Sequence, residues 1–154
     1  MGNIRAGEQD SGHVGGYSAD RGGVGQTGQR SLIVWRVLSA VLLLTMGGIH
    51  LYLVLTGVGG VLGVLFVLNA IGGVVLAVAI IAVPPRFLPA ASVLGLLFIA
   101  GTLLALVLAL TVGLFGIREQ LGTQLVPTTL IGESIGIIVL AVTTSLAFRM
   151  RRSG

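Results

Sequence analysis

Four long apolar stretches, separated by short clusters of glycine, proline and polar residues, dominate the hydrophobic pattern of this chain. They cover about residues 32–56, 61–83, 90–114 and 127–148. A helix rises about 1.5 Å per residue, so each stretch is long enough to cross a hydrocarbon core about 30 Å thick. The pattern therefore predicts an all-α protein, an integral membrane four-helix bundle.

Residue types that interrupt helices lie between the predicted spans. The glycine-rich residues 56–60 predict a tight turn after the first span. Three prolines within residues 84–89 break the second helix, because proline lacks the N–H that an inner helical turn requires. Residues 115–126, which include Arg118 and Glu119, predict a short loop, and Pro127 is acceptable in the first turn of the last helix.

Residues 1–30 differ in composition from the rest of the chain. They are rich in glycine and polar residues and contain few large apolar side chains. Such a segment cannot bury enough surface to offset the entropy lost on ordering. We therefore expect a disordered N-terminal tail at residues 1–30 and a four-helix transmembrane domain at residues 31–154.

The charge content agrees with lipid as the solvent. Charged residues make up 9% of the chain, against roughly a quarter in soluble domains. Between Val37 and Leu114 the only charged side chain is Arg86. The chain has no cysteine, which excludes disulfides, thiolate metal sites and thiol redox chemistry.

The arginines predict the orientation in the membrane, and the chain has no lysine. An even number of spans places both termini on one side, together with the loop at 84–89. The arginines expected on that side are Arg30, Arg36, Arg86, Arg149, Arg151 and Arg152. The other side has Arg118 beside Glu119. The positive-inside rule then predicts a multi-pass protein of the cell membrane with both termini cytoplasmic. The high pI reflects these flanking arginines, so we expect no nucleic-acid partner.

Small residues repeat at helical spacing in the third span. Four of them follow one another at steps of four, namely Gly101, Ala105, Ala109 and Gly113. Such stripes allow membrane helices to approach closely. Two interpretations stay open, which are packing within one bundle and association with a second copy or with another membrane protein. The second span holds a shorter pair, Gly73 with Ala77.

Three polar side chains lie inside the predicted spans, where they are costly. His50, Asn69 and Glu133 come from three different spans. At 1.5 Å per residue they lie roughly 9, 13 and 9 Å below the outer boundary. A polar side chain at this depth favours the bundle interior over lipid. We therefore expect the three to converge, with Glu119 and Arg118 above them at the outer mouth.

Two interpretations of this cluster lead to different structures. As a structural cluster, Glu133 is neutral or paired with His50, and Asn69 bridges helices in close packing. As a binding or proton-accepting site, the cluster lines a cavity that reaches Glu133 from the outer face. A carboxylate beside an imidazole suits proton coupling, because burial and neighbours tune the proton affinity of both groups. A metal or haem site is the weakest alternative, since one histidine and one carboxylate do not complete a ligand set.

The membrane region resembles small four-span actinobacterial membrane proteins of unknown function. The resemblance rests on GIHLYL at 48–53, FVLNAIGG at 66–73 and GES at 132–134, and it implies no activity. The four spans are also similar in number to those of the small multidrug resistance transporters, which are proton-coupled dimers. Those proteins have their essential carboxylate in the first span, whereas the candidate here, Glu133, lies in the fourth.

No nucleophile elbow, P-loop, dinucleotide fingerprint or zinc-protease helix occurs in the sequence. We therefore expect a protein that is not an enzyme and has no cofactor, acting as a bundle subunit or interaction partner in the membrane. The alternative is a small proton-linked transporter or ligand-binding module. In that alternative Glu133 accepts the proton, and His50 and Asn69 shape the pocket.

The predicted topology can be tested with single cysteines, because the chain has none of its own. A membrane-impermeant maleimide is expected to label Thr123→Cys in intact cells. It is expected to label Ser18→Cys only after the membrane is permeabilised. Labelling of Ser18→Cys in intact cells would contradict the cytoplasmic position of the N-terminus.

Overall fold

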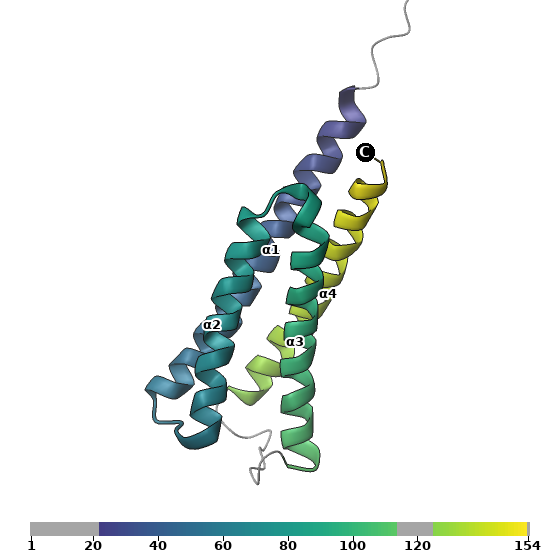
Figure 1. Cartoon of the computed structure of the whole chain (residues 1–154). Coiled ribbons are helices and arrows are strands. Elements are labelled where there is room, and N and C mark those ends of the chain that lie inside the picture. The colour runs from purple at the N-terminus through teal and green to yellow at the C-terminus, as the bar shows by residue number, and fades with distance from the viewer. Residues whose placement is uncertain (1–21, 114–124, 154) are drawn as a thin grey trace, which may run out of the picture.

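A computed structural model of the chain describes residues 22–113 and 125–153, and within these the side chains of 28–113 and 125–152. It contains four α-helices: α1 (Gly22–Leu55), α2 (Gly60–Ala82), α3 (Leu88–Thr111) and α4 (Val126–Ser153). A short 3₁₀ turn, η1 (Pro85–Phe87), precedes α3 (Figure 1). All four helices are long and apolar enough to cross a membrane. The predicted four-helix fold is therefore confirmed.

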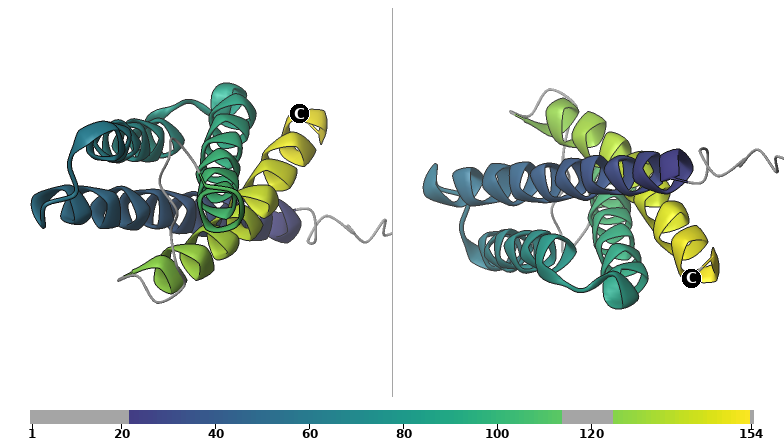
Figure 2. Two further views of the ribbon diagram at one scale, coloured as in Figure 1. Left: turned by 90° about the horizontal axis from the view of Figure 1, so that it is seen from below. Right: turned by 90° about the horizontal axis from the view of Figure 1, so that it is seen from above.

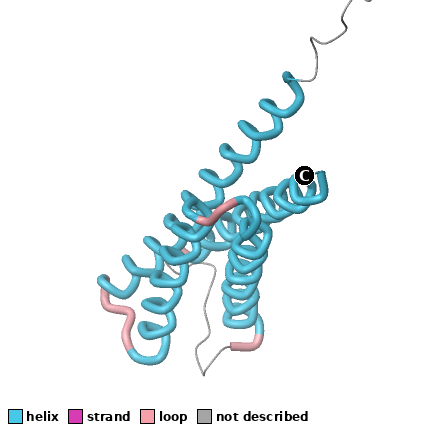
Figure 3. Tube along the Cα trace, turned by 45° about the horizontal axis from the view of Figure 1, so that its top comes forward, coloured by secondary structure: helices cyan, strands magenta, loops and turns pink. Residues whose placement is uncertain are grey.

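The first and last helices are longer than the apolar pattern indicated. Helix α1 begins at Gly22, inside the segment that we expected to be disordered, and it extends beyond the other helices (Figure 3). Propagating an existing helix costs far less than nucleating one, so a long apolar span can carry a polar extension. Residues 1–21 of the expected tail lie outside the described residues. Helix α4 runs to Ser153, with Arg151 and Arg152 in its last turn, where cations interact favourably with the helix dipole.

A glycine in the left-handed region ends α1. Gly57 has φ 110°. Its N–H donates to the Val54 carbonyl at 3.1 Å, and the Val58 N–H donates to the Leu53 carbonyl at 3.1 Å. This pair of bonds is a Schellman motif, which satisfies carbonyls that the helix end would leave unpaired. The predicted turn is therefore present. We call the end of the bundle that holds it the turn end, and the opposite end, with η1, the terminal end.

The helices form two pairs. Helices α1 and α2 run alongside each other, and α3 and α4 are inclined to them (Figure 2). The pairs meet mainly where α1 crosses α4, whereas α2 and α3 have the sparsest contacts of the neighbouring helices. Near this crossing, Leu43, Ile80, Ile99 and Leu140 are fully buried. The arrangement leaves room between α2 and α3 toward the turn end.

Glycines set the separation of α1 and α2. A Cβ atom at Gly73 would lie 2.8 Å from the Leu43 carbonyl oxygen, and one at Gly47 would lie 3.2 Å from the Ala70 carbonyl oxygen. Neither position leaves room for a side chain without a shift of the backbone. Of the small pair that the sequence indicated in the second span, Gly73 packs against α1, and Ala77, one turn along, is also buried.

Polar contacts tie helices together near the terminal end. The Arg36 side chain of α1 donates to three carbonyls at the end of α2: Ile80 at 2.9 Å, Ile81 at 2.8 Å and Val83 at 2.9 Å. The buried hydroxyls of Ser39 and Thr143 lie 2.8 Å apart and join α1 to α4. Arg36 thus does more than mark topology, because it caps the C-terminus of a neighbouring helix.

The close approach of α1 and α2 predicts different effects of alanine at Gly73 and at Gly48. Gly73→Ala is expected to destabilise the bundle by about 1–3 kcal/mol, the usual cost of overpacking. Gly48→Ala is the matched control, because nothing lies within 4 Å of a Cβ atom there. It is expected to be neutral or slightly stabilising, since alanine favours helix over glycine. Thermal unfolding in detergent measures both, and equal effects would contradict the close contact at Gly73.

Candidate functional site

The predicted polar residues His50 and Asn69 are in direct contact. His50 lies on α1 and is 6% exposed, and Asn69 lies beside it on α2. The Asn69 Nδ2 amide donates to His50 Nε2 at 3.2 Å, and His50 Nδ1 lies 2.8 Å from the Met46 carbonyl oxygen. A carbonyl can only accept, so Nδ1 has the proton and Nε2 receives the Asn69 hydrogen bond. The two partners therefore fix the tautomer and orientation of the ring.

The close approach of α1 and α2 makes this contact possible. Gly47, Ala70 and Gly73 bring the two backbones together within one turn of His50 and Asn69. An aromatic neighbour completes the local packing, because the Phe66 ring meets the His50 ring edge to face, with centroids 4.9 Å apart. The small residues at this contact let the two backbones approach, and this approach brings Asn69 within hydrogen-bonding distance of the imidazole.

Glu133 is the most deeply buried ionisable side chain of the site. It lies on α4 and is 1% exposed. The Thr102 hydroxyl of α3 lies beside its carboxyl group and donates to the Ile99 carbonyl of its own helix at 2.8 Å. Among the described residues, the carboxyl oxygen Oε2 of Glu133 has no hydrogen-bond partner. A buried carboxyl oxygen without a donor is costly, so this atom is the least satisfied polar group of the site.

One cavity connects these side chains. It has a volume of about 550 Å³ and lies between α2 and α3, with Glu133 of α4 and His50 of α1 in its wall. Its lining is mainly apolar, and Asn69 and Thr102 also contribute polar atoms. It extends to the turn end, where Val58 and Val126 border it. We call it the α2–α3 cavity.

The structure thus brings three of the four predicted site residues to one cavity. His50, Asn69 and Glu133 all line it. Glu119, together with Arg118, lies outside the described residues. Glu133 does not pair with His50, because both ring nitrogens of His50 are already engaged by Met46 and Asn69. A cavity that reaches Glu133 is the feature on which the two interpretations of the cluster differ.

Sequence reasoning missed Thr102 as a neighbour of Glu133. It is one of several threonines inside the spans that bond a carbonyl of their own helix, Thr102 with Ile99 and Thr111 with Val107. Such self-satisfied hydroxyls are common in membrane helices, so the residue type gives little signal. Its depth along the helix is a stronger signal. Thr102 lies nine positions before the end of α3 at Thr111, which is close to the depth expected for Glu133 on α4.

The stripe of small residues on α3 also has a different role from helix packing. Gly101, Ala105 and Ala109 line the α2–α3 cavity. No atom lies within 4 Å of a Cβ atom built at Gly101. Gly113 follows the end of α3 with φ 86°, a conformation in which glycine ends helices. The small side chains therefore provide space, and association through this stripe stays a prediction.

The described residues contain no group of three or more His, Cys, Asp or Glu side chains that could hold a metal ion. No family model, curated protein or solved structure matches the chain. The geometry of the site is therefore the basis for inferring a function, and the actinobacterial resemblance stays a prediction.

A double-mutant cycle can test the His50–Asn69 contact. Asn69→Leu alone is expected to destabilise the protein by about 1–3 kcal/mol, because it leaves the buried Nε2 atom unpaired. In a His50→Leu background the same substitution is expected to cost less, which gives a coupling energy of about 0.5–1.5 kcal/mol. Thermal unfolding of the four proteins gives this value. Strictly additive effects would contradict the contact.

Proposed function

We propose that this protein is a non-enzymatic ligand-binding module of the cell membrane, with both termini cytoplasmic and the turn end facing outward. Its ligand is a small apolar molecule that bears a hydrogen-bond-donating, basic group. The observation that carries the proposal is the α2–α3 cavity, whose wall contains the unpartnered Oε2 atom of Glu133. His50 and Asn69 form the polar part of the opposite wall.

The basic group of the ligand follows from the electrostatics of the site. Glu133 is the only acidic residue in the described part of the chain. Arg36 binds carbonyls at the end of α2, and the α2–α3 cavity has no arginine among its described lining residues. A carboxyl group in such surroundings gains most from a ligand that supplies both a donor and a positive charge.

The size and lining of the cavity favour a small apolar ligand. About 550 Å³ lies within the range of roughly 300–1,000 Å³ that is typical of small-molecule sites. Such sites combine apolar walls with a few convergent polar groups that fix orientation. Leu62, Phe66, Phe98 and Leu106 supply apolar wall here, and Glu133 with Thr102 supplies a polar anchor.

The structural alternative accounts for only part of this arrangement. A structural role accounts for His50 and Asn69, because the Asn69–His50 hydrogen bond joins α1 to α2 and the Met46 carbonyl bonds the other ring nitrogen. It does not account for the cavity, or for a buried carboxyl oxygen that faces no donor among the described residues. Ligand binding accounts for both features.

Decylamine and decanol form a matched pair of probes, because they share a chain length and differ in the basic group. Decylamine is expected to raise the melting temperature of the purified protein in detergent by several degrees more than decanol. A free ligand at 100 times its Kd stabilises by about 2.7 kcal/mol, and 1 kcal/mol shifts the melting temperature by about 2–4 °C in a protein of this size class. The difference between probes is expected to disappear in Glu133→Gln.

Ser134→Ala is the control for this experiment. Ser134 adjoins Glu133 in the sequence, but its hydroxyl bonds the Leu130 carbonyl of its own helix at 2.7 Å. The variant is expected to keep the full preference for decylamine. Equal shifts by both probes in the unmodified protein, or an undiminished preference in Glu133→Gln, would overturn the proposed function.

A further inference from the structure

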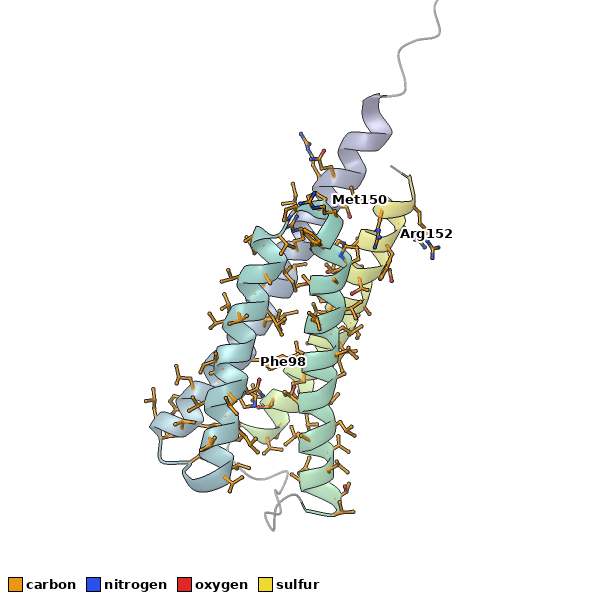
Figure 4. The ribbon with its side chains drawn as sticks, in the orientation of Figure 1. Phe98, Met150 and Arg152 are labelled. Carbon is orange, nitrogen blue, oxygen red and sulfur yellow. The ribbon has the colours of Figure 1, made fainter. Side chains whose placement is uncertain are left out.

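Helices α2 and α3 are in contact at Ile80 and Gly95 and, closer to the turn end, at Gly72 and Phe98 near the middle of the bundle. There the Phe98 ring of α3 lies against the backbone of Gly72 on α2, where a Cβ atom would meet the ring at 2.7 Å. Phe98 lies between the two helices at the level from which they diverge toward the turn end (Figure 4). Phe98 therefore forms the floor of the α2–α3 cavity.

Beyond this floor, residues of the cavity wall are also part of the outer surface. Leu68 of α2 is 58% exposed and Leu97 of α3 is 63% exposed, yet both line the cavity. Gly101, one turn along α3 from Leu97, is exposed as well and has open space at its Cβ position. Side chains that face both the cavity and the surface are the edges of an opening. We call the opening between Leu68, Leu97 and Gly101 the lateral slot.

The lateral slot faces hydrocarbon and not water. Leu68 lies eight residues into α2, which begins at Gly60, so it lies about 12 Å from the end of the helix. Exposed Val64, Ile71, Leu94 and Leu104 continue the apolar surface around it. A helix surface of this composition at this depth is in contact with acyl chains.

We propose that the α2–α3 cavity is loaded from the bilayer through the lateral slot, and that its ligand is a lipid-soluble amine. This inference rests on the proposed function and adds the route and the class of ligand. Glu133 lies seven residues into α4, about 10 Å below the helix end. A phospholipid is held with its headgroup at the interface, whereas an uncharged amine dissolves in the hydrocarbon and reaches this depth.

Binding involves one proton transfer and no other reaction. The amine enters uncharged, its alkyl chain contacts the leucines and phenylalanines of the wall, and its nitrogen takes the proton of the uncharged Glu133 carboxyl group. The resulting ammonium group donates hydrogen bonds to the Glu133 carboxylate, including Oε2. The bond to Oε2 satisfies the atom that has no partner among the described residues. Gly101 at the slot has open space at its Cβ position, and Ala105 lines the cavity one turn further along α3.

Tryptophan quenching by brominated lipid tests the route. The chain has one tryptophan, Trp35, so Trp35→Phe with Phe66→Trp places a single reporter in the cavity wall. In vesicles of phosphatidylcholine with dibrominated acyl chains, the reporter is expected to be quenched through the slot. Decylamine is expected to relieve this quenching, and decanol is not. Leu106→Trp on the opposite wall replaces Phe66→Trp if that variant unfolds.

Matched leucine variants locate the entry. Gly101→Leu narrows the lateral slot and is expected to abolish most of the quenching. Gly48→Leu adds the same side chain to another exposed helical position with open space, outside the cavity lining, and is expected to leave the quenching unchanged. Loss of quenching in both variants, or in neither, would contradict entry between α2 and α3.

The two proposals fail in different ways. If decylamine stabilises the protein but brominated chains do not quench the reporter, the ligand site stands and the lateral route is wrong. If brominated chains quench the reporter but decylamine neither relieves the quenching nor stabilises the protein, the slot is open and the amine site is wrong, which overturns both the ligand class inferred here and the proposed function.

Discussion

The absence of hydrogen-bond partners in lipid is the constraint on which the rest of this structure depends. Every polar side chain inside a span must find a partner within the bundle. His50 and Asn69 satisfy each other with the help of the Met46 carbonyl, Ser39 and Thr143 pair between α1 and α4, and Arg36 caps α2. Buried Glu133 Oε2 and Thr144 Oγ1 are the described exceptions, and of these two residues Glu133 lines the α2–α3 cavity.

Small residues permit close packing on α2 and leave a cavity on α3. On α2 they remove side chains from the contact with α1, so backbones approach and His50 meets Asn69. On α3 they face a helix that stands apart, so the same lack of side chains leaves a cavity. The difference depends on whether the neighbouring helix closes the space. Helices α1 and α2 pack closely, whereas the contact between α2 and α3 is sparse and the cavity lies between those two helices.

The level of each polar residue could be predicted, but its neighbours could not. The rise of a helix fixes depth from sequence position, so His50, Asn69 and Glu133 were expected in the same half of the bundle, and they do line one cavity. Rotation about the helix axis and the order of the helices depend on packing. Glu133 therefore turns out to face Thr102 and not His50, and Thr102 gave no signal because threonine also bonds its own helix.

The sequence by itself determined four apolar helices, the two turns between them that the structure describes, and the positions of the costly polar groups along the helices, because length, hydropathy and helical rise are local properties. Only the tertiary structure decided that α2 and α3 diverge beyond Phe98, that Gly101 and Ala105 border space instead of a helix, and that one oxygen of Glu133 is buried without a donor among the described residues. These features arise from how the two helix pairs are inclined to each other, which depends on contacts between residues far apart in the chain.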